Sequence, residues 1–150
     1  MSVRSRGALW ALVATSSLMV GCGTSPEEGL LEGTYAAAID PPVVGYATLN
    51  CDRLIPHVSL VVNAQGEFDL SIDVADDCSR AGGGIAPFEV LKLGTYARVG
   101  PTLSFTPDGE AGPTFTGQIE GEYIRLTLPA EFEELAPNDL EIRIGPRSPL

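Results

Sequence analysis

The sequence predicts an all-β fold, an antiparallel meander of about seven or eight strands that forms a small barrel or sandwich. Three observations carry this prediction. Apolar residues recur mostly at every second position, turn-forming residues separate neighbouring apolar runs, and each run has one apolar face. The domain expected over residues 30–146 is long enough for one hydrophobic core and too short for two ordinary domains.

A β-hairpin is expected over residues 57–74. Alternating apolar residues form its inward face: Val58, Leu60 and Val62 before the turn, and Phe68, Leu70, Ile72 and Val74 after it. A three-residue loop over residues 64–66 would place Gly66 where the backbone needs a positive φ. This loop sets Val62 opposite Phe68, so the apolar pattern and the turn agree on one register.

A second hairpin is expected in the segment TFTGQIEGEYIRLTL, which starts at residue 114. A two-residue turn at Glu120 and Gly121 would set Gly117 opposite Ile124, with one apolar and one polar face. Four further strands are expected at residues 32–39, 90–99, 102–106 and 139–144, with the register between residues 88 and 106 left open. The only helical turn is expected in PAEFEELAP, between the prolines at positions 129 and 137.

Residues 1–21 have the order of an export signal. Arg4 and Arg6 precede an uncharged apolar run of 14 residues, GALWALVATSSLMV, and a glycine then leads directly to Cys22. A helix that crosses a bilayer needs about 20 apolar residues, so a permanent membrane span is the weaker interpretation. We therefore expect residues 1–21 to be a signal peptide that is cut before Cys22.

The residues LMVGC at positions 18–22 resemble the lipobox of bacterial lipoproteins, with Met19 where that family usually has leucine. The resemblance implies that the thiol of Cys22 carries diacylglycerol and that the new amine is acylated. Several buried acyl chains hold a protein durably on a membrane. Gly23 stands where an aspartate would retain such a protein at the inner membrane, which implies the outer membrane, on its periplasmic or cell-surface face. A buried cysteine or a disulfide partner is the alternative role of Cys22.

Cleavage would leave a lipid-anchored tether over residues 22–29, the domain, and a flexible tail over residues 147–150. It would also remove Arg4 and Arg6, so that seven basic residues face 20 acidic ones, a net charge of −13. Such a surface repels nucleic acids and anionic lipid headgroups at long range. We expect no nucleic-acid partner, and solubility of an exported protein is the simpler meaning of the charge.

Two further cysteines, Cys51 and Cys78, would lie in an oxidising compartment after export. An even pair there indicates a disulfide, which would stabilise the fold by roughly 3 kcal/mol. A structural zinc site needs about four ligands, and His57 is the only histidine. We therefore expect no metal and no cofactor.

The sequence offers no constellation typical of an active site. His57 alternates onto the face opposite the apolar one, and nucleophile sites usually pair a serine or cysteine with a histidine. Asp73, Asp76 and Asp77 crowd a loop beside the expected disulfide, where acids serve solvation or, less often, a weak calcium contact. GGGIAP at residues 82–87 lacks the lysine and the serine or threonine of a phosphate loop and indicates a connector. We expect that the protein is not an enzyme.

The tripeptide Gly-Thr-Tyr occurs at residues 33–35 and again at 94–96, where ARVGPTLSF follows it. This pattern resembles bacterial lipocalin-like lipoproteins, with Tyr35 where tryptophan is commoner and Arg143 as the candidate for the arginine that covers it. The resemblance implies a small barrel that binds a ligand. Membrane-spanning barrels turn their apolar face outward and need no lipid anchor, so the apolar face is expected inside.

Two functions remain open at this point. In the first, the barrel interior or its mouth binds a small apolar or amphipathic molecule. The candidate lining residues are Leu60, Val62, Phe68, Leu70, Phe115, Gly117 and Leu126. Gly94 and Gly117 would leave room for a shallow pocket at one end. In the second, the interior is filled, and the surface or a loop binds another envelope protein as a scaffold or inhibitor.

Overall fold

The computed structural model describes residues 31–48 and 50–147, and the expected signal peptide, Cys22 and the tether lie outside these residues. Eight antiparallel strands, neighbours in chain order, form a closed barrel. They are β1 (Gly33–Ala47), β2 (Asp52–Val62), β3 (Glu67–Asp77), β4 (Ile85–Val99), β5 (Thr102–Pro107), β6 (Phe115–Glu120), β7 (Tyr123–Leu128) and β8 (Leu140–Pro146). The predicted all-β meander is confirmed, and its closed form is consistent with a lipocalin-like barrel.

Two single-turn 3-10 helices complete the described chain. η1 (Ser79–Ala81) lies between β3 and β4, and η2 (Phe132–Glu134) lies between β7 and β8. The second occupies the segment where the sequence predicts a helical turn. In the described ranges, no helix has the length and hydropathy that crossing a membrane requires.

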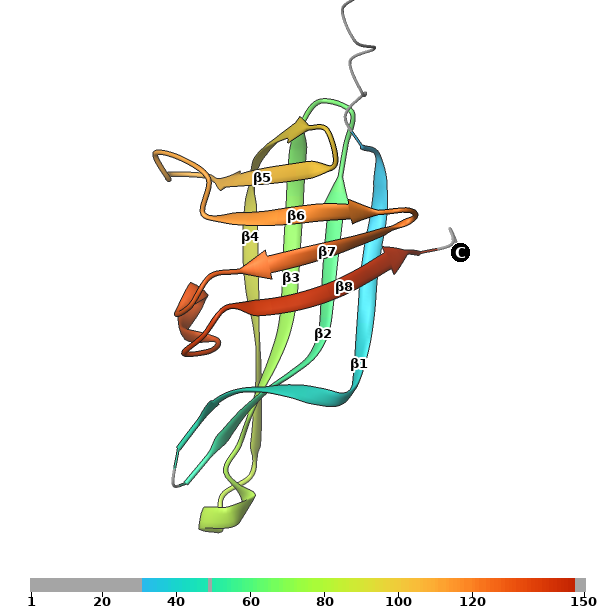
Figure 1. Cartoon of the computed structure of the whole chain (residues 1–150). Helices are drawn as coiled ribbons and strands as arrows, with labels where there is room; N and C mark the ends of the chain where they lie inside the picture. The colour runs from blue at the N-terminus through green and yellow to red at the C-terminus, as the bar shows by residue number, and fades with distance from the viewer. Residues whose placement is uncertain (1–30, 49, 148–150) are drawn as a thin grey trace, which may run out of the picture.

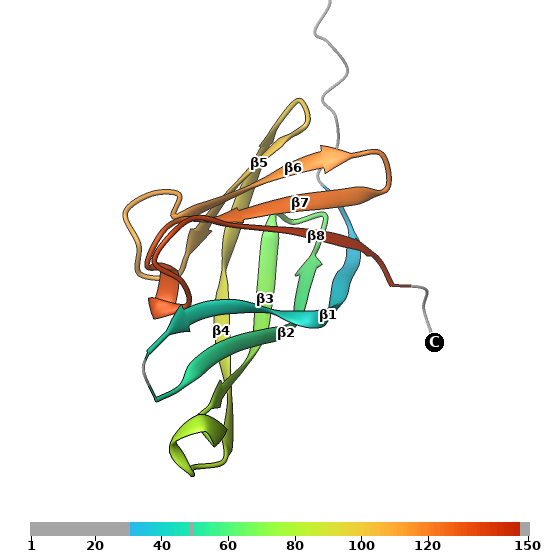
Figure 2. The same ribbon diagram turned by 60° about the horizontal axis from the view of Figure 1, so that its bottom comes forward.

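The strands fall into a long set and a short set. β1–β4 have 11 to 15 residues, whereas β5–β8 have six or seven. The short strands run across the upper halves of the long ones, and the two sets join where β4 pairs with β5 and β1 with β8 (Figure 1). Beyond this barrel body, the long strands continue into what we call the projection, residues 43–48, 50–54 and 75–88 (Figure 2).

The hairpin of β2 and β3 has the predicted register. Val62 pairs with Phe68, and Gly66 closes the loop with a φ of 83°. The side-chain oxygen of Asn63 accepts hydrogen bonds from the backbone N–H groups of Gln65 (3.0 Å) and Glu67 (2.9 Å). This asparagine therefore satisfies the loop amides that the two strands leave unpaired.

The register of the hairpin between β6 and β7 was predicted wrongly. Gly117 pairs with Leu126 rather than Ile124, because the loop consists of Gly121 and Glu122, one residue later than expected. Gly121 has a φ of 66° and takes the first loop position, where a type II′ turn favours glycine. The pairing partners shift by two residues, so the inward and outward faces stay as predicted.

Two strands are longer than the sequence predicts. β4 begins at Ile85 rather than residue 90, so only residues 82–84 serve as a connector. β1 continues to Ala47, with a register shift between Ala38 and Val43 where two prolines interrupt its donors. The pairing left open in the sequence is Val99 with Thr102, across a two-residue turn.

The inward face of every strand contributes to one core, and three phenylalanines lie at its centre. Phe105 stacks on Phe115 with ring centroids 4.6 Å apart, and Phe68 meets both rings edge-on at 5.2 and 5.5 Å. Tyr96 closes one end, where its hydroxyl donates to the Leu31 carbonyl at 2.6 Å. In the part of the chain described, no polar or charged residue is fully buried.

Arg143 does not cover Tyr35, the role that the family resemblance implied. Its guanidinium lies 4.0 Å from the ring centroid of Tyr123. Arg143 pairs with Arg125 on β7 and is exposed on the outside of the barrel, whereas Tyr35 packs against the core. An outward side chain of β8 cannot reach an aromatic ring that faces inward from β1.

Candidate functional site

The structure places all the candidate lining residues inside the barrel body, packed against one another. Their side chains have exposed fractions between 0 and 4%: Leu60, Val62, Phe68, Leu70, Phe115 and Leu126. The residues thus share one place, but that place is filled by their own side chains. Their role in ligand binding stays a prediction.

The two glycines that were expected to open a pocket instead allow close packing. A Cβ added at Gly117 would lie 3.1 Å from Ile124 Cγ2 and 3.3 Å from Phe105 Cε2. A Cβ at Gly94 would lie 2.2 Å from the Thr106 carbonyl oxygen. Atoms of the paired neighbouring strands and of the core side chains occupy the space that each missing side chain leaves.

A shallow hollow of about 390 Å³ lies beside the loop between β2 and β3. Val62 and Phe68 line it, together with Asn63, Leu93 and Asp108. It is a depression at one end of the barrel. Leu70, Phe115 and Leu126, however, are not among the residues that line it.

A larger hollow, of about 710 Å³, lies between the projection and the segment that carries η2. We call it the lower hollow. It is lined by Tyr46, Thr48, Cys51, Arg53, Asp76, Glu131 and Glu134. Four separate segments supply these residues, and the sequence indicated only one of them, the acidic stretch before Cys78, as a possible site. That stretch was expected to be a loop, which is wrong: Asp73, Asp76 and Asp77 lie in β3, where they pair with β2.

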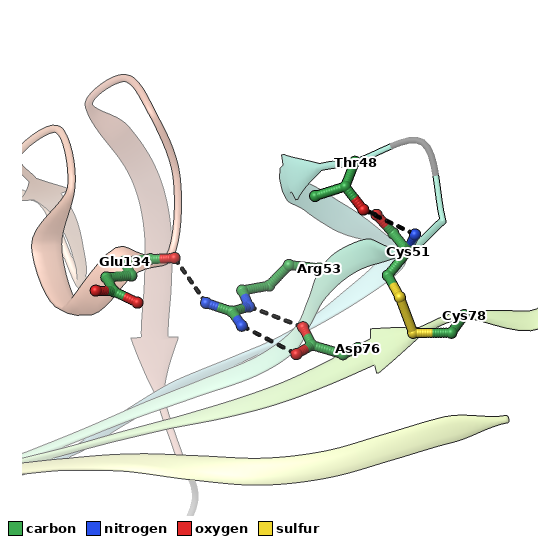
Figure 3. Close-up of polar contacts among 6 residues, drawn as sticks. All are labelled: Thr48, Cys51, Arg53, Asp76, Cys78 and Glu134. Atoms are coloured by element: carbon green, nitrogen blue, oxygen red, sulfur yellow. Dashed lines mark hydrogen bonds and ion pairs between the residues drawn. A yellow bond between two sulfur atoms is a disulfide. The ribbon is translucent and has the colours of Figure 1, made fainter. Parts of the chain in front are cut away.

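An ion pair between Arg53 and Asp76 forms one wall of the lower hollow. The two residues face each other on β2 and β3, and the contact is bidentate, with Nε to Oδ1 at 2.8 Å and Nη2 to Oδ2 at 2.9 Å (Figure 3). Arg53 Nη1 also donates to the Glu134 carbonyl at 2.8 Å. The hydrogen bonds from Arg53 lower the pKa of Asp76, although partial burial acts in the opposite direction. Both oxygens of this carboxylate are thus engaged by Arg53.

The opposite wall is the segment around η2, which is held in an uncommon backbone conformation. Glu131, Glu133 and Glu134 have φ values of 63°, 48° and 56°. Left-handed conformations cost roughly 1–2 kcal/mol each for residues with a side chain, so surrounding contacts must maintain them. One such contact is the ion pair between Lys92 Nζ and Glu133 Oε1 at 2.5 Å.

Gly45 brings β1 against this strained segment. The N–H of the next residue, Tyr46, donates to the Leu135 carbonyl at 3.0 Å. A Cβ at Gly45 would lie 2.0 Å from the same carbonyl oxygen, a distance that no side chain could occupy. The approach of β1 to η2, and with it the shape of the lower hollow, therefore requires glycine at position 45.

The open side of the lower hollow is negative. The hydroxyl of Tyr46 lies 3.5 Å from Glu131 Oε1, and the pKa of Tyr46 is raised by desolvation and then by the charge of Glu131. The charge of Arg53 is balanced by Asp76, so the carboxylates of Glu131 and Glu134 leave an excess of negative charge. The hollow can therefore attract a cationic group to a wall that also offers an aromatic ring.

The predicted disulfide between Cys51 and Cys78 is present and fastens the outer end of the projection. It joins the residue before β2 to the residue after β3. The turn that leads to Cys51 is held by Thr48, whose side-chain oxygen accepts the Cys51 N–H at 2.9 Å (Figure 3). The disulfide thereby fixes the outer rim of the lower hollow.

His57 lies apart from the lower hollow. Its Nδ1 is 3.4 Å from Asp73 Oδ2, on the face of the sheet that points away from the core. Among the residues described, no group of three or more histidine, cysteine or acidic side chains is arranged to hold a metal ion. No family model, curated protein or solved structure matches the chain.

Proposed function

We propose that this protein is an outer-membrane lipoprotein, anchored through Cys22, whose barrel is a non-enzymatic binding domain for a small amphipathic ligand. The order of basic residues, apolar run and glycine before Cys22 supports the anchor. The closed barrel supports a binding domain, because small barrels of this kind hold side chains or one ligand. Cys22 itself lies outside the described residues.

The site we propose is the lower hollow, at the mouth of the barrel, rather than the filled interior. Ligand pockets usually measure about 300–1,000 Å³, and the lower hollow is about 710 Å³. A pocket of this size, walled by a fixed ion pair and a disulfide, is the single observation that carries the proposal. It needs little rearrangement to receive a ligand.

The chemistry of the lower hollow indicates which ligand it takes. The ring of Tyr46 and the disulfide offer apolar contact, while Glu131 and Glu134 attract positive charge. A cation above an aromatic ring is further stabilised by the negative face of that ring. The ligand is therefore a small amphipathic cation, such as an alkylated amine, and an amphipathic anion is repelled.

Calorimetric titration of lipid-free Cys22→Ser protein tests this proposal. Dodecyltrimethylammonium, below its micellar concentration, should bind at least tenfold more tightly than dodecanoate. The double variant Glu131→Gln, Glu134→Gln should lose that preference, whereas Glu110→Gln, an exposed acid on another loop, should keep it. Equal binding of both amphiphiles, or undiminished binding to the double variant, would overturn the proposed site.

The anchor has a separate test in cells. Cys22→Ser should release the protein from membranes, because the substitution removes the acylated thiol, and labelled palmitate should enter only the wild type. A protein that stays in the membrane fraction without taking up label contradicts the anchor and leaves the site in the lower hollow unaffected.

A further inference from the structure

The lower half of β4 has a neighbouring strand on one side only. β4 pairs with β3 from Ile85 to Thr95, but with β5 only from Gly94 onward. Between Ile85 and Leu91, within the described residues, no backbone hydrogen bond is made on the side away from β3. This stretch is a free sheet edge.

The register of the strand shows which backbone groups point to the free edge. The N–H of Asp108 donates to the Leu93 carbonyl at 2.8 Å, so the polar groups of Leu93 point toward the β5 side. Backbone groups alternate in direction along an antiparallel strand, and those of Leu91 and Glu89 therefore point the same way. Pro87 also faces this side. Proline has no N–H to donate, and on the free edge it therefore interrupts no hydrogen bond with β3.

The free edge is unusually apolar for an exposed strand. Ile85, Leu91 and Leu93 are 62, 60 and 55% exposed on the outer face, and Phe88 is 40% exposed on the inner face. Every residue from Ile85 to Glu89 is exposed. Proteins usually blunt or cover such an edge, because it pairs readily with another chain. Large apolar side chains beside unpaired backbone groups are features of a docking site.

We infer that the lower half of β4 receives an extended segment of a partner protein as an added strand, and that this segment is basic. Asp69, Asp73 and Glu89 lie on the outer face of β3 and β4 around the apolar side chains. Glu89 accepts a hydrogen bond from the Ser71 hydroxyl at 2.5 Å, which holds its carboxylate on this face. Lysine or arginine side chains of an added strand complement these carboxylates.

A second copy of this chain is the less suitable occupant. Each copy has 20 acidic against nine basic residues, so pairing of two free edges would bring like charges together. The two basic groups near the inner face are already engaged, Lys92 with Glu133 and Arg53 with Asp76. Charge complementarity therefore selects a basic segment over a second copy.

The added strand uses both backbone and side-chain contacts. The N–H and C=O groups of Glu89 and Leu91 supply its hydrogen bonds, which gives affinity that depends little on sequence. Specificity comes from alternate positions, where basic residues meet Glu89 and apolar residues cover Leu91. This interaction is independent of the lower hollow, because neither Glu89 nor Leu91 lines it.

Fluorescence anisotropy with labelled nonapeptides tests the inference on the mature Cys22→Ser protein. A peptide with lysine and valine at successive positions of one face, Lys-Thr-Val-Thr-Lys-Thr-Val-Thr-Lys, should bind. Its counterpart with glutamate for lysine should bind at least tenfold more weakly. The lysine peptide with N-methyl groups at alternate residues cannot donate backbone hydrogen bonds to the free edge. Its affinity should also be at least tenfold lower. Equal binding of either counterpart, or no binding of the lysine peptide, would overturn the inference.

Two matched variants locate the site on β4. Leu91→Lys, on the free half of β4, should lower the affinity for the lysine peptide at least tenfold, because it places a positive charge at the edge. Val99→Lys, 80% exposed on the half that pairs with β5, should leave binding unchanged. Equal effects of the two variants would refute the location. Self-association in sedimentation, reversed by Leu91→Lys, would make a second copy the occupant and refute the basic partner. The Glu131→Gln, Glu134→Gln double variant, which should lose its preference for the cationic amphiphile, should bind the lysine peptide as the wild type does. The two proposals can therefore fail separately.

Discussion

The four long strands run through both the barrel body and the projection, yet different interactions stabilise the two regions. In the body, inward residues of β2 and β3 such as Leu60 and Leu70 are fully buried. In the projection the corresponding inward positions hold Arg53 and Asp76, whose side chains are 22% and 31% exposed. The strands run from one region into the other, with a register shift between Leu54 and His57 in the pairing of β2 with β3, but the short strands cover only the upper halves of the long ones (Figure 1).

This difference shows that an inward position of β1–β4 is apolar where β5–β8 pack over it and can be charged where they do not. Where β5–β8 cover the sheet, apolar side chains are removed from water and contribute about 1.5–3 kcal/mol each. Where the cover ends, the sheet is held by a disulfide, a bidentate ion pair and the strained segment at η2. The body should therefore resist unfolding more strongly, while the projection offers accessible polar groups and a free edge.

The largest expected effect comes from the body. Phe105→Ala should lower the free energy of unfolding by about 3–5 kcal/mol, because it removes a fully buried ring from between Phe68 and Phe115. Phe88→Ala in the projection, where the ring is 40% exposed, should cost less than about 1 kcal/mol. Urea unfolding followed by circular dichroism measures both. Similar losses for the two variants would contradict the division into body and projection.

The next largest effect comes from the disulfide. Cys51→Ser with Cys78→Ser opens a loop with a sequence separation of 27, which should cost about 3.5 kcal/mol on the chain-entropy model. Native-state hydrogen exchange should then rise at the outer ends of β2 and β3 while the amides of the body stay protected. If exchange instead rises throughout the body, the two regions unfold as one unit and the comparison fails.

The sequence was informative where a local turn and the apolar pattern specify the same pairing. Gly66 allows one loop length, so the register of β2 with β3 followed from it. In IEGEYI both Glu-Gly and Gly-Glu can form a two-residue turn, and alternation fixes a register only to within two residues. The faces of β6 and β7 were therefore predicted correctly while their pairing was not.

The lower hollow could not have been predicted from the sequence in this way. It depends on Gly45 meeting Leu135, and these residues come from segments far apart in the chain. Neither the alternation of apolar residues nor the turn-forming residues of the sequence specify that contact. The missed signal was the glycine itself, which lies just beyond two prolines in a segment with no obvious strand pattern.

A smaller effect, with a defined pH dependence, comes from the ion pair of the projection. Asp76→Asn should cost about 1 kcal/mol at pH 7, because it removes the charge that Arg53 contacts at two points. The pKa of Asp76 is lowered from its usual 3.8, so the carboxylate stabilises the folded state above that pH. The contribution is lost as the pH falls through the folded-state pKa. Urea unfolding of wild type and variant should therefore differ at pH 7 and converge in acid; a constant difference would assign the effect to packing.

The smallest effect, and the only one expected to stabilise, concerns the strained segment that faces the projection. Glu134 has a φ of 56°, which glycine adopts without strain, while its carbonyl oxygen accepts from Arg53 whatever the side chain. Glu134→Gly should relieve roughly 1–2 kcal/mol of strain and lose about 0.5–1 kcal/mol through the more flexible unfolded chain, a net gain between zero and about 1.5 kcal/mol. Glu134→Gln keeps the strain and removes only the charge, so it should leave thermal stability unchanged. Both variants should bind an amphipathic cation more weakly than the wild type, because both lack the carboxylate at the lower hollow. If the glycine variant is instead less stable than the glutamine variant by about 0.5–1 kcal/mol, the flexibility of the unfolded chain alone explains the result. The left-handed conformation then carries no cost here, and the idea that the projection maintains strain at its site must be abandoned.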